Sequence, residues 1–396
     1  ALLWPCAPLI ADLFQGDMRI VPLARVMFLT FILNASAIVQ TNRLMKRMDV
    51  RMVAVSNVIG LIVSGCVGIG LALAGFGAWA IVWQSITLAA VKSAVLWITG
   101  HWWPALEFSW TSLKSFFRVG SGIMVSSFLN VVFQNIYSFF VGNRVGLAGL
   151  GYYSQADKWS KMGISSLSQV LTSTFVPTLS AVQDQPERFR RICSKMNRFT
   201  AYLLFPAMIG LMVMARPIFH TLFGEKWDPS IFLFQLLLLR GIFTVMISLY
   251  NNYLLALGDA RIIMRLEIVR DVAALIALVA TLPFLAISLP GDPVYGIGIM
   301  LWGQLTASVL TWVLTLFYTV RITGAKLWSY LYDLIPYFAL TAVIVPVMYL
   351  ASGLFETPLL KLSAEAFTGL VLYLGANALL RSRVQQQVLA YLRGRF

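Results

Sequence analysis

Long apolar runs alternate with short polar connections along almost the whole chain. A helix needs about 20 largely apolar residues to cross a hydrocarbon core of ~30 Å. Runs of suitable length predict a partial span at residues 1–14 and whole spans at 20–41, 53–74, 78–99, 118–142, 154–182, 198–216, 229–257, 263–289, 294–320, 328–353 and 360–380. The pattern therefore predicts an all-α polytopic membrane protein with about eleven whole spans and one partial span.

Two segments are too polar to cross a bilayer. Residues 100–117 mix aromatic and charged side chains, and residues 383–396 have the same character, so both are predicted to lie along the membrane interface.

The chain opens on an apolar run with neither an initiator Met nor a charged segment before it. This favours a fragment that begins inside a helix over a cleaved signal peptide.

Composition supports the membrane class. Apolar residues make up 59% of the chain and charged residues only 12%, against roughly 45–50% and about 25% in soluble domains. The net charge of +14 does not indicate a nucleic-acid partner, because the basic residues form short groups between apolar runs instead of one clustered patch. The three cysteines, Cys6, Cys66 and Cys193, are too far apart for a disulfide framework or a metal site.

Lysine and arginine fall mainly on alternate connections. The connections around residues 43–51, 92–118, 188–198, 261–270, 321–326 and 381–395 hold most of the 30 basic residues. By the positive-inside rule, that side of the membrane and the C-terminus are predicted to be cytoplasmic. Lys92 is assigned to the second of these connections, at residues 92–118.

Polar side chains repeat at helical spacing inside several predicted spans, where they must face other helices or a wet cavity. The stripes are Arg240, Thr244, Ser248 and Asn251; Ser126, Asn130, Gln134 and Tyr137; Ser154, Lys158, Lys161, Ser165, Ser168 and Thr172; Gln304, Ser308, Thr311 and Thr315; and Arg25, Ser36 and Gln40. Serine and threonine members also suit ordinary helix contacts. Arg25, Lys158 and Lys161 lie near span ends, so snorkelling to the interface is an alternative for them.

Arg240 lies deeper than the other cations. It follows the Trp227–Asp228 boundary by about twelve residues, which is roughly 18 Å along a helix. We expect it to face a cavity, and the alternative is a buried pair with Asp333 or Glu365.

Candidate catalytic groups are few. His101 and His220 are the two histidines, and neither has carboxylates or cysteines at ligand spacing. No connection pairs two acids as glycosyl transfer requires. The sequence therefore predicts a protein that is not an enzyme and that binds no metal or cofactor.

Several segments resemble one family in their order and spacing. Residues 109–162 resemble the segment that opens the second half of Wzx-type polysaccharide flippases. The similar motifs are a helix end at Val141–Gly146 and a helix start at Leu150–Ala156. These flippases belong to the MATE-like multidrug/oligosaccharidyl-lipid/polysaccharide exporter superfamily. Further segments resemble that family in the same order: "RLMKRMDVRMVAVSNVIG" before it, and "STFVPTLSAVQDQPERFRR", "FHTLFGEKWDPS" and "NNYLLALGDARIIMRLEIVRDV" after it.

The resemblance implies a plan of fourteen helices, arranged as two six-helix lobes and a final pair, from which the first two to three helices are absent here. On this plan, residues 1–99 form an incomplete N-terminal lobe and 100–117 an interfacial linker. Residues 118–320 form the C-terminal lobe, and 321–396 the last two helices and a cytoplasmic tail. It also implies a multi-pass protein of the bacterial inner membrane that acts as a monomer.

The function implied by the resemblance is translocation of an undecaprenyl-pyrophosphate-linked oligosaccharide by alternating access, for polysaccharide or lipopolysaccharide biosynthesis. The expected substrate-binding residues are Arg240, Arg25, Lys158 and Lys161 as cations, and Asn130, Gln134, Asn251 and Gln304 as neutral lining. The lipid tail is expected along 328–380, and the partners are membrane lipids and neighbouring polysaccharide polymerase and glycosyltransferase enzymes.

Three alternatives remain at this point. A cation-coupled multidrug exporter of the same superfamily needs an acid in mid-membrane, whereas the acids counted here, Asp12, Asp271, Asp333 and Glu365, cluster near span ends. A membrane glycosyltransferase or ligase needs a large catalytic loop, and no connection is long enough. An assembly subunit would not need the charged stripes.

Overall fold

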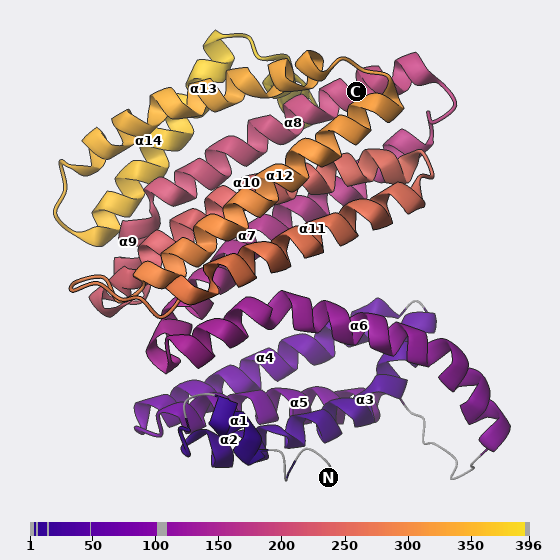
Figure 1. Ribbon diagram of the computed structural model, residues 1–396, viewed down its shortest axis with the longest axis vertical. Coiled ribbons are helices and arrows are strands. Elements are labelled where there is room, and N and C mark those ends of the chain that lie inside the picture. Colours follow the sequence, from indigo (N-terminus) through magenta and orange to yellow (C-terminus); the bar gives the residue numbers. More distant parts are fainter. Residues whose placement is uncertain (1–3, 5–6, 14–15, 48, 101–108, 393–396) are drawn as a thin grey trace. The chain divides into compact units, whose positions relative to one another are not determined.

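The computed structural model describes residues 4, 7–13, 16–47, 49–100 and 109–392, and its regular elements in those ranges are all helices. Contacts divide the chain into two compact units, Ala1–Asn130 and Val131–Phe396. Both units are built from helices (Figure 1). The predicted all-α class is confirmed.

The first unit contains α1 (Ala7–Leu13), α2 (Ile20–Met27), α3 (Leu29–Lys46), α4 (Val50–Leu73), α5 (Ala78–Gly100) and the first part of α6 (Trp110–Arg144). Helix α5 packs along both α4 and α3. The carboxylate of Asp49 caps α4 by accepting a hydrogen bond from the amide of Met52 at 3.4 Å. Gly75 and Gly77 have positive φ angles in the turn that leads into α5.

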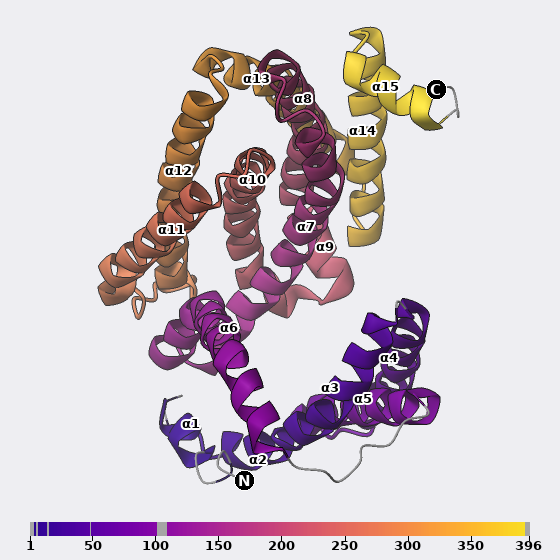
Figure 2. The ribbon, with the colours of Figure 1, turned by 90° about the vertical axis from the view of Figure 1, so that its right-hand side faces the viewer.

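The second unit continues with the rest of α6, then α7 (Leu147–Ser180), α8 (Pro186–Val213), α9 (Ala215–Leu222), η1 (Glu225–Trp227), α10 (Asp228–Ala256), α11 (Ala260–Thr281), η2 (Leu282–Phe284), α12 (Tyr295–Thr323), α13 (Leu327–Ser352), α14 (Pro358–Leu379) and α15 (Arg383–Leu392). Helix α10 is central, because it packs against α7, α12 and α8 (Figure 2). Its side chains Leu237, Tyr250 and Tyr253 are completely buried. Helix α13 packs on α8, and α14 packs on α13.

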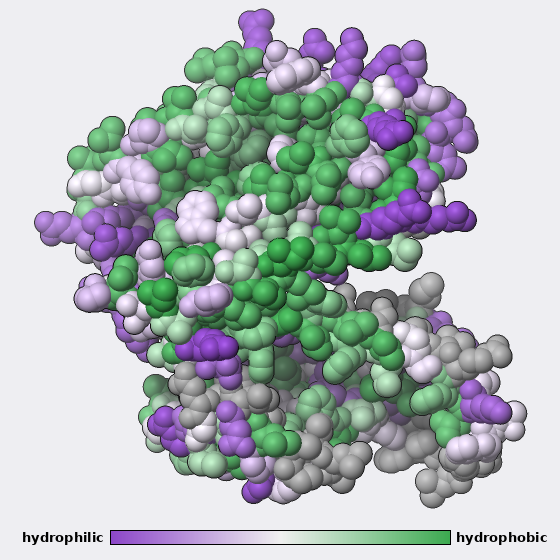
Figure 3. Space-filling view, in the orientation of Figure 1, coloured by the Kyte–Doolittle hydropathy of each residue, from purple (hydrophilic) through white to green (hydrophobic). Residues whose placement is uncertain are grey.

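Helices α4, α5, α10, α12, α13 and α14 follow the predicted spans closely, whereas α6, α7 and α8 begin well before the predicted spans at 118–142, 154–182 and 198–216. Nine helical segments in the described ranges are long and apolar enough to cross a membrane. Helices α7 and α11 are not among them. The part of α7 after Lys161 is rich in Ser, Thr and Gln, which lowers its mean hydropathy, and α11 carries Arg265 and other charged residues in its first half. Apolar side chains cover the middle of the second unit's helices, and hydrophilic ones gather toward the helix ends (Figure 3). The chain is therefore a multi-pass membrane protein.

The predicted interfacial segments differ in part from the helices observed. Residues 101–108 of the 100–117 segment lie outside the described residues, and Trp110–Phe117 run without a break into α6. Helix α6 therefore begins before the predicted span at 118–142, while the interfacial location and the lobe boundaries stay predictions. Within 383–396, residues Arg383–Leu392 form α15, and 393–396 lie outside the described part. Only Ala7–Leu13 of the partial span 1–14 are seen as a helix.

Candidate functional site

The clearest polar contact inside the second unit joins two of the predicted site residues. Arg240 of α10 is half-buried, and its Nη1 donates a hydrogen bond to Oε1 of Gln304 on α12, a side chain that is 3% exposed. Nε of Arg240 is buried without a hydrogen-bond partner among the described residues. Nε2 of Gln304 has no partner of normal geometry there, although Tyr153 lies close enough to interact with it. The pair therefore keeps hydrogen-bonding capacity for an acceptor that is not part of the chain.

Helix packing explains why this pair forms. Helix α10 lies against α12 on one side and against α7 on another. At Gly241, a Cβ atom would lie only 2.5 Å from Cδ1 of Ile164 on α7, so the absence of a side chain permits the close approach of α7 and α10. The adjacent Arg240 is thereby held between the two neighbouring helices.

Two tyrosines lie around the guanidinium. Tyr137 of α6 and Tyr153 of α7 are buried and lie within electrostatic range of Arg240. The hydroxyl of Tyr137 donates to the carbonyl of Ala274 at 2.6 Å, which leaves its oxygen as an acceptor. Phenol and amide groups beside a fixed cation suit a ligand that combines hydroxyl groups with negative charge.

The polar stripe on α7 lies on an exposed face of its unit. Ser154, Lys158, Lys161, Ser165 and Thr172 are exposed. Lys158 forms no ion pair with any described residue, whereas Nζ of Lys161 lies 2.6 Å from Oδ2 of Asp157. An exposed polar face on a helix of a membrane protein must meet water or other polar groups.

Asp157 is a residue that the sequence reasoning missed. It lies about ten residues into α7, or about 15 Å along the axis, and is 8% exposed. Its Oδ1 is buried without a hydrogen-bond partner in the described part of the chain. The sequence feature that could have revealed Asp157 is its spacing of four residues from Lys161, which places the two side chains on one helix face. Asp157 therefore adds one buried acid inside a helix to the acids considered for ion coupling.

Asn251 belongs to a different cluster from Arg240, although both are on α10. It lies about 16 Å further along the axis, and its amide donates to Oε1 of Glu267 on α11 at 3.5 Å. Glu267 also pairs with Arg270 at 2.8 Å. The structure thus joins Arg240 to Gln304 and places Asn251 in an ion-pair cluster elsewhere in the unit.

The remaining predicted residues are not part of the Arg240–Gln304 pair. Gln134 is exposed on α6, and the side chain of Asn130 lies outside what the structure describes. Arg25 belongs to the first unit, where its guanidinium lies 5.9 Å from the ring centroid of Trp4 and its Nε is buried without a hydrogen-bond partner among the described residues. Their substrate-binding roles stay predictions.

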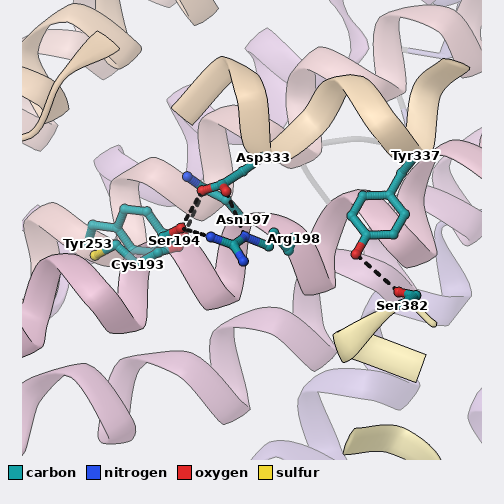
Figure 4. A network of polar contacts seen from close by, with 8 residues as sticks. All are labelled: Cys193, Ser194, Asn197, Arg198, Tyr253, Asp333, Tyr337 and Ser382. Atoms are coloured by element: carbon teal, nitrogen blue, oxygen red, sulfur yellow. Dashed lines mark hydrogen bonds and ion pairs between the residues drawn. The ribbon is translucent and has the colours of Figure 1, made fainter. Parts of the chain in front are cut away.

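The predicted alternative, a buried pair between Arg240 and an acid, is wrong. Oδ1 of Asp333 on α13 accepts from Nε of Arg198 on α8 at 2.7 Å, and Ser194 donates to its Oδ2 at 2.6 Å (Figure 4). Glu365, the other acid considered, forms no ion pair with any described residue. Asp333 instead fixes α13 to α8.

The first unit contains a polar cavity that the sequence reasoning also missed. It has a volume of about 580 Å³ and is lined by Thr30, Asn34, Asn57, Leu61, Ser85, Leu88, Ala89 and Lys92. Lys92 is half-buried inside α5, about 12 Å before the end of that helix, so counting it with a connection was wrong. Helices α3, α4 and α5 carry no acid to pair with it. Its spacing of seven residues from Ser85 was the sequence signal for a shared helix face.

Both units therefore offer cations and amide groups inside the membrane-spanning region. Guanidinium and ammonium groups bind phosphate and carboxylate, and amide and hydroxyl groups bind sugar hydroxyls. In the described ranges, no group of three or more His, Cys, Asp or Glu side chains could hold a metal ion.

Comparison with known protein families matches residues 1–232 to the family described as "Polysaccharide biosynthesis protein". The chain belongs to this family. It is 27% identical over 252 residues to the succinoglycan biosynthesis transport protein ExoT of Rhizobium meliloti, covering 63% of this chain and 51% of that protein. It is 26% identical to the teichuronic acid biosynthesis protein TuaB of Bacillus subtilis, over 65% of this chain and 54% of that protein.

A third relative is the lipopolysaccharide biosynthesis protein WzxC of Escherichia coli, which is 25% identical over 58% of this chain and 45% of that protein. The chain thus spans about half the length of the curated relatives it matches. Among solved structures, the lipid II flippase MurJ in an inward closed conformation matches with a TM-score of 0.72 and 14% identity, covering 96% of this chain and 80% of that one. The similarity to MurJ shows that the two share a fold.

Proposed function

We propose that this chain is the translocating part of a flippase that moves an undecaprenyl-pyrophosphate-linked oligosaccharide from the inner to the outer leaflet of a bacterial inner membrane by alternating access. The observation that carries the proposal is the Arg240–Gln304 pair, which holds an unused donor deep inside apolar helices. A buried guanidinium without a carboxylate partner is costly in a bilayer unless an anion or water solvates it. A pyrophosphate supplies that negative charge, and sugar hydroxyls match the amides and phenols nearby.

Other features support the same substrate class. Lys158 and Lys161 lie on the exposed polar face of α7, and Lys92 lines the cavity of the first unit. The relatives are named for biosynthesis or transport of polysaccharides, teichuronic acid and lipopolysaccharide. In this proposal the lipid tail stays in the bilayer along α13 and α14, and the transporter is a monomer. Glycosyltransferase and polymerase enzymes are its partners and act on the oligosaccharide before and after its translocation.

Complementation tests the role of Arg240. Full-length protein carrying Arg240→Ala, at limiting expression in a transporter-null strain, should restore much less surface polysaccharide than wild type, and Arg240→Lys should restore an intermediate amount. The matched control is Arg216→Ala, which removes an exposed arginine from α9. Equal polysaccharide from Arg240→Ala and Arg216→Ala, at equal protein levels, would refute a substrate contact at Arg240.

A cation-coupled exporter is the second candidate, and one observation favours it. Asp157 is a buried acid deep in α7, and one of its oxygens has no partner among the described residues, which is the type of group that ion coupling uses. Transport by full-length protein in proteoliposomes, measured with and without an imposed pH or Na⁺ gradient, tests it. A rate that responds to neither gradient, in wild type and in Asp157→Asn alike, removes the ion-coupled candidate.

A further inference from the structure

A cavity between α8, α13 and α14 shares no lining residue with the Arg240–Gln304 pair. Its volume is about 590 Å³, within the ~300–1,000 Å³ of pockets that take small molecules. Its lining is almost entirely apolar and includes Leu203, Met348 and Leu370. Small residues create the space: a Cβ atom at Gly369 would lie 3.0 Å from Sδ of Met348. A larger residue at this position would therefore push into the cavity.

One acid lines this apolar cavity. Glu365 of α14 is 3% exposed, and its Oε2 has no hydrogen-bond partner among the described residues. Lys361, one turn earlier, is close enough to act on the carboxyl electrostatically but forms no ion pair with it. The charge in the cavity is therefore not neutralised by any described residue.

Three hydroxyl groups in or beside the cavity already donate to backbone carbonyls. Tyr373 donates to the carbonyl of Tyr202 at 2.9 Å, and Thr341 donates to the carbonyl of Tyr337 at 2.8 Å. Ser352, beside the carboxyl, donates to the carbonyl of Tyr349 at 3.0 Å. Its hydroxyl also lies within hydrogen-bonding range of the Glu365 carboxyl. Oε2 of that carboxyl has no partner among the described residues, so it remains available to a donor from outside the chain.

Charge and shape together define the ligand. An ionised carboxylate in apolar surroundings is costly unless a cation pairs with it. The aromatic rings of Tyr202 and Tyr373 line the same cavity, and ring faces also attract cations. We propose that this cavity binds a lipophilic amine, with its ammonium group on Glu365 and its hydrocarbon part against α8 and α13. This site does not depend on the proposed translocation of a lipid-linked oligosaccharide.

Photolabelling tests the proposal on full-length protein in lipid nanodiscs. The probe is decylamine carrying a diazirine, and the uncharged match is the corresponding decanol. The amine should label peptides of α8, α13 and α14 saturably, and the alcohol should not. Glu365→Gln should weaken the amine's apparent affinity by roughly tenfold or more, as expected when one partner of a buried charge pair is lost. Glu356→Gln, an exposed acid near the start of α14, should leave it unchanged.

Three outcomes would overturn the proposal: equal labelling by amine and alcohol in wild type, equal amine affinity in Glu365→Gln and Glu356→Gln, or displacement of the amine by undecaprenyl phosphate. The last result would assign the cavity to a substrate tail. The comparison of amine with alcohol uses wild-type protein, so it tests the amine site even if Glu365→Gln fails to fold. Gly369→Leu, which fills the cavity, should abolish saturable labelling.

Discussion

At the residue scale, the site depends on charged groups whose hydrogen bonds are incomplete. Arg240 binds Gln304 and keeps its Nε without a partner, and Asp157 binds Lys161 and keeps one oxygen without a partner among the described residues. In a bilayer such groups are tolerated where a wet cavity or a ligand completes them. Arg240 and Gln304 therefore mark where an anionic, hydroxyl-rich substrate is expected to bind, whereas the free oxygen of Asp157 suits a cation.

Substitution of Gln304 tests the pair itself. Gln304→Leu leaves Nη1 of Arg240 without its acceptor, so we expect the free energy of unfolding in detergent to fall by about 1–2 kcal/mol. Thermal unfolding of full-length protein measures this effect. The control is Thr306→Val, an exposed position on the same helix, which should change stability little. A Gln304→Leu protein as stable as the control would mean that the pair does not contribute to stability.

The sequence predicted some of these residues and missed others for identifiable reasons. Arg240 stands out because it interrupts a long apolar run, and that contrast is visible in the sequence itself. Lys92 was missed because it was assigned to a connection, and Asp157 because it was not among the acids considered for ion coupling. Their depth depends on where α7 and α5 begin and end, which apolar runs define poorly when a helix extends beyond the hydrocarbon core.

At the element scale, α10 organises the second unit through close contacts. Gly241 allows α7 to approach α10, and the Arg198–Asp333 pair fixes α13 to α8. Hydrophobic periodicity predicted the helices well, because a membrane helix must satisfy its backbone internally over its full length. It did not predict the continuity of α6, because the polar residues near its start resemble an interfacial segment.

Enlarging Gly241 should separate α7 from α10. Gly241→Leu should lower the free energy of unfolding by about 1–3 kcal/mol, because extra atoms in a packed contact force shifts of the neighbours. Ile164→Ala in the same protein should recover part of that loss. Gly151→Ala on α7, where a new Cβ meets nothing within 4 Å, is the control. If Ile164→Ala lowers the free energy of unfolding of the Gly241→Leu protein further, the α7–α10 contact is contradicted.

Removal of Asp333 should loosen α13. Asp333→Ala leaves Arg198 and Ser194 without their shared acceptor, but the arginine side chain is 43% exposed and partly solvated. We therefore expect a loss of about 1–3 kcal/mol, less than for a fully buried pair. Denaturation compared with Glu356→Ala, an exposed acid, measures the effect. An equal stability of the two variants would contradict the role of Asp333 in fixing α13 to α8.

At the scale of the whole molecule, family membership and fold agree on a multi-pass membrane protein related to polysaccharide biosynthesis proteins. The order of motifs along the sequence is enough to indicate this family, because motif order reflects the arrangement of the helices in the chain. The direction of the chain through the membrane rests on the distribution of lysine and arginine. That distribution predicts that the connection from α7 to α8 and the C-terminus lie in the cytoplasm.

Cysteine labelling tests this orientation. In full-length protein whose native cysteines have been replaced, Gln185→Cys before α8 should resist a membrane-impermeant maleimide added from the periplasmic side. Glu356→Cys, between α13 and α14, should react with it. Both positions are exposed, so access depends on the side of the membrane. The opposite pattern would reverse the proposed topology and the proposed direction of transport.

The central claim is tested most directly by flipping measured in proteoliposomes. Full-length wild-type protein should make an undecaprenyl-pyrophosphate-linked oligosaccharide accessible to a lectin on the opposite leaflet, and Arg240→Ala should slow this at least roughly tenfold, as expected for loss of a charged contact. Arg216→Ala should match wild type. If the wild-type protein does not change the accessibility of the oligosaccharide, or if Arg240→Ala flips it as fast as Arg216→Ala, the account of Arg240 as the cation that binds the substrate headgroup is contradicted.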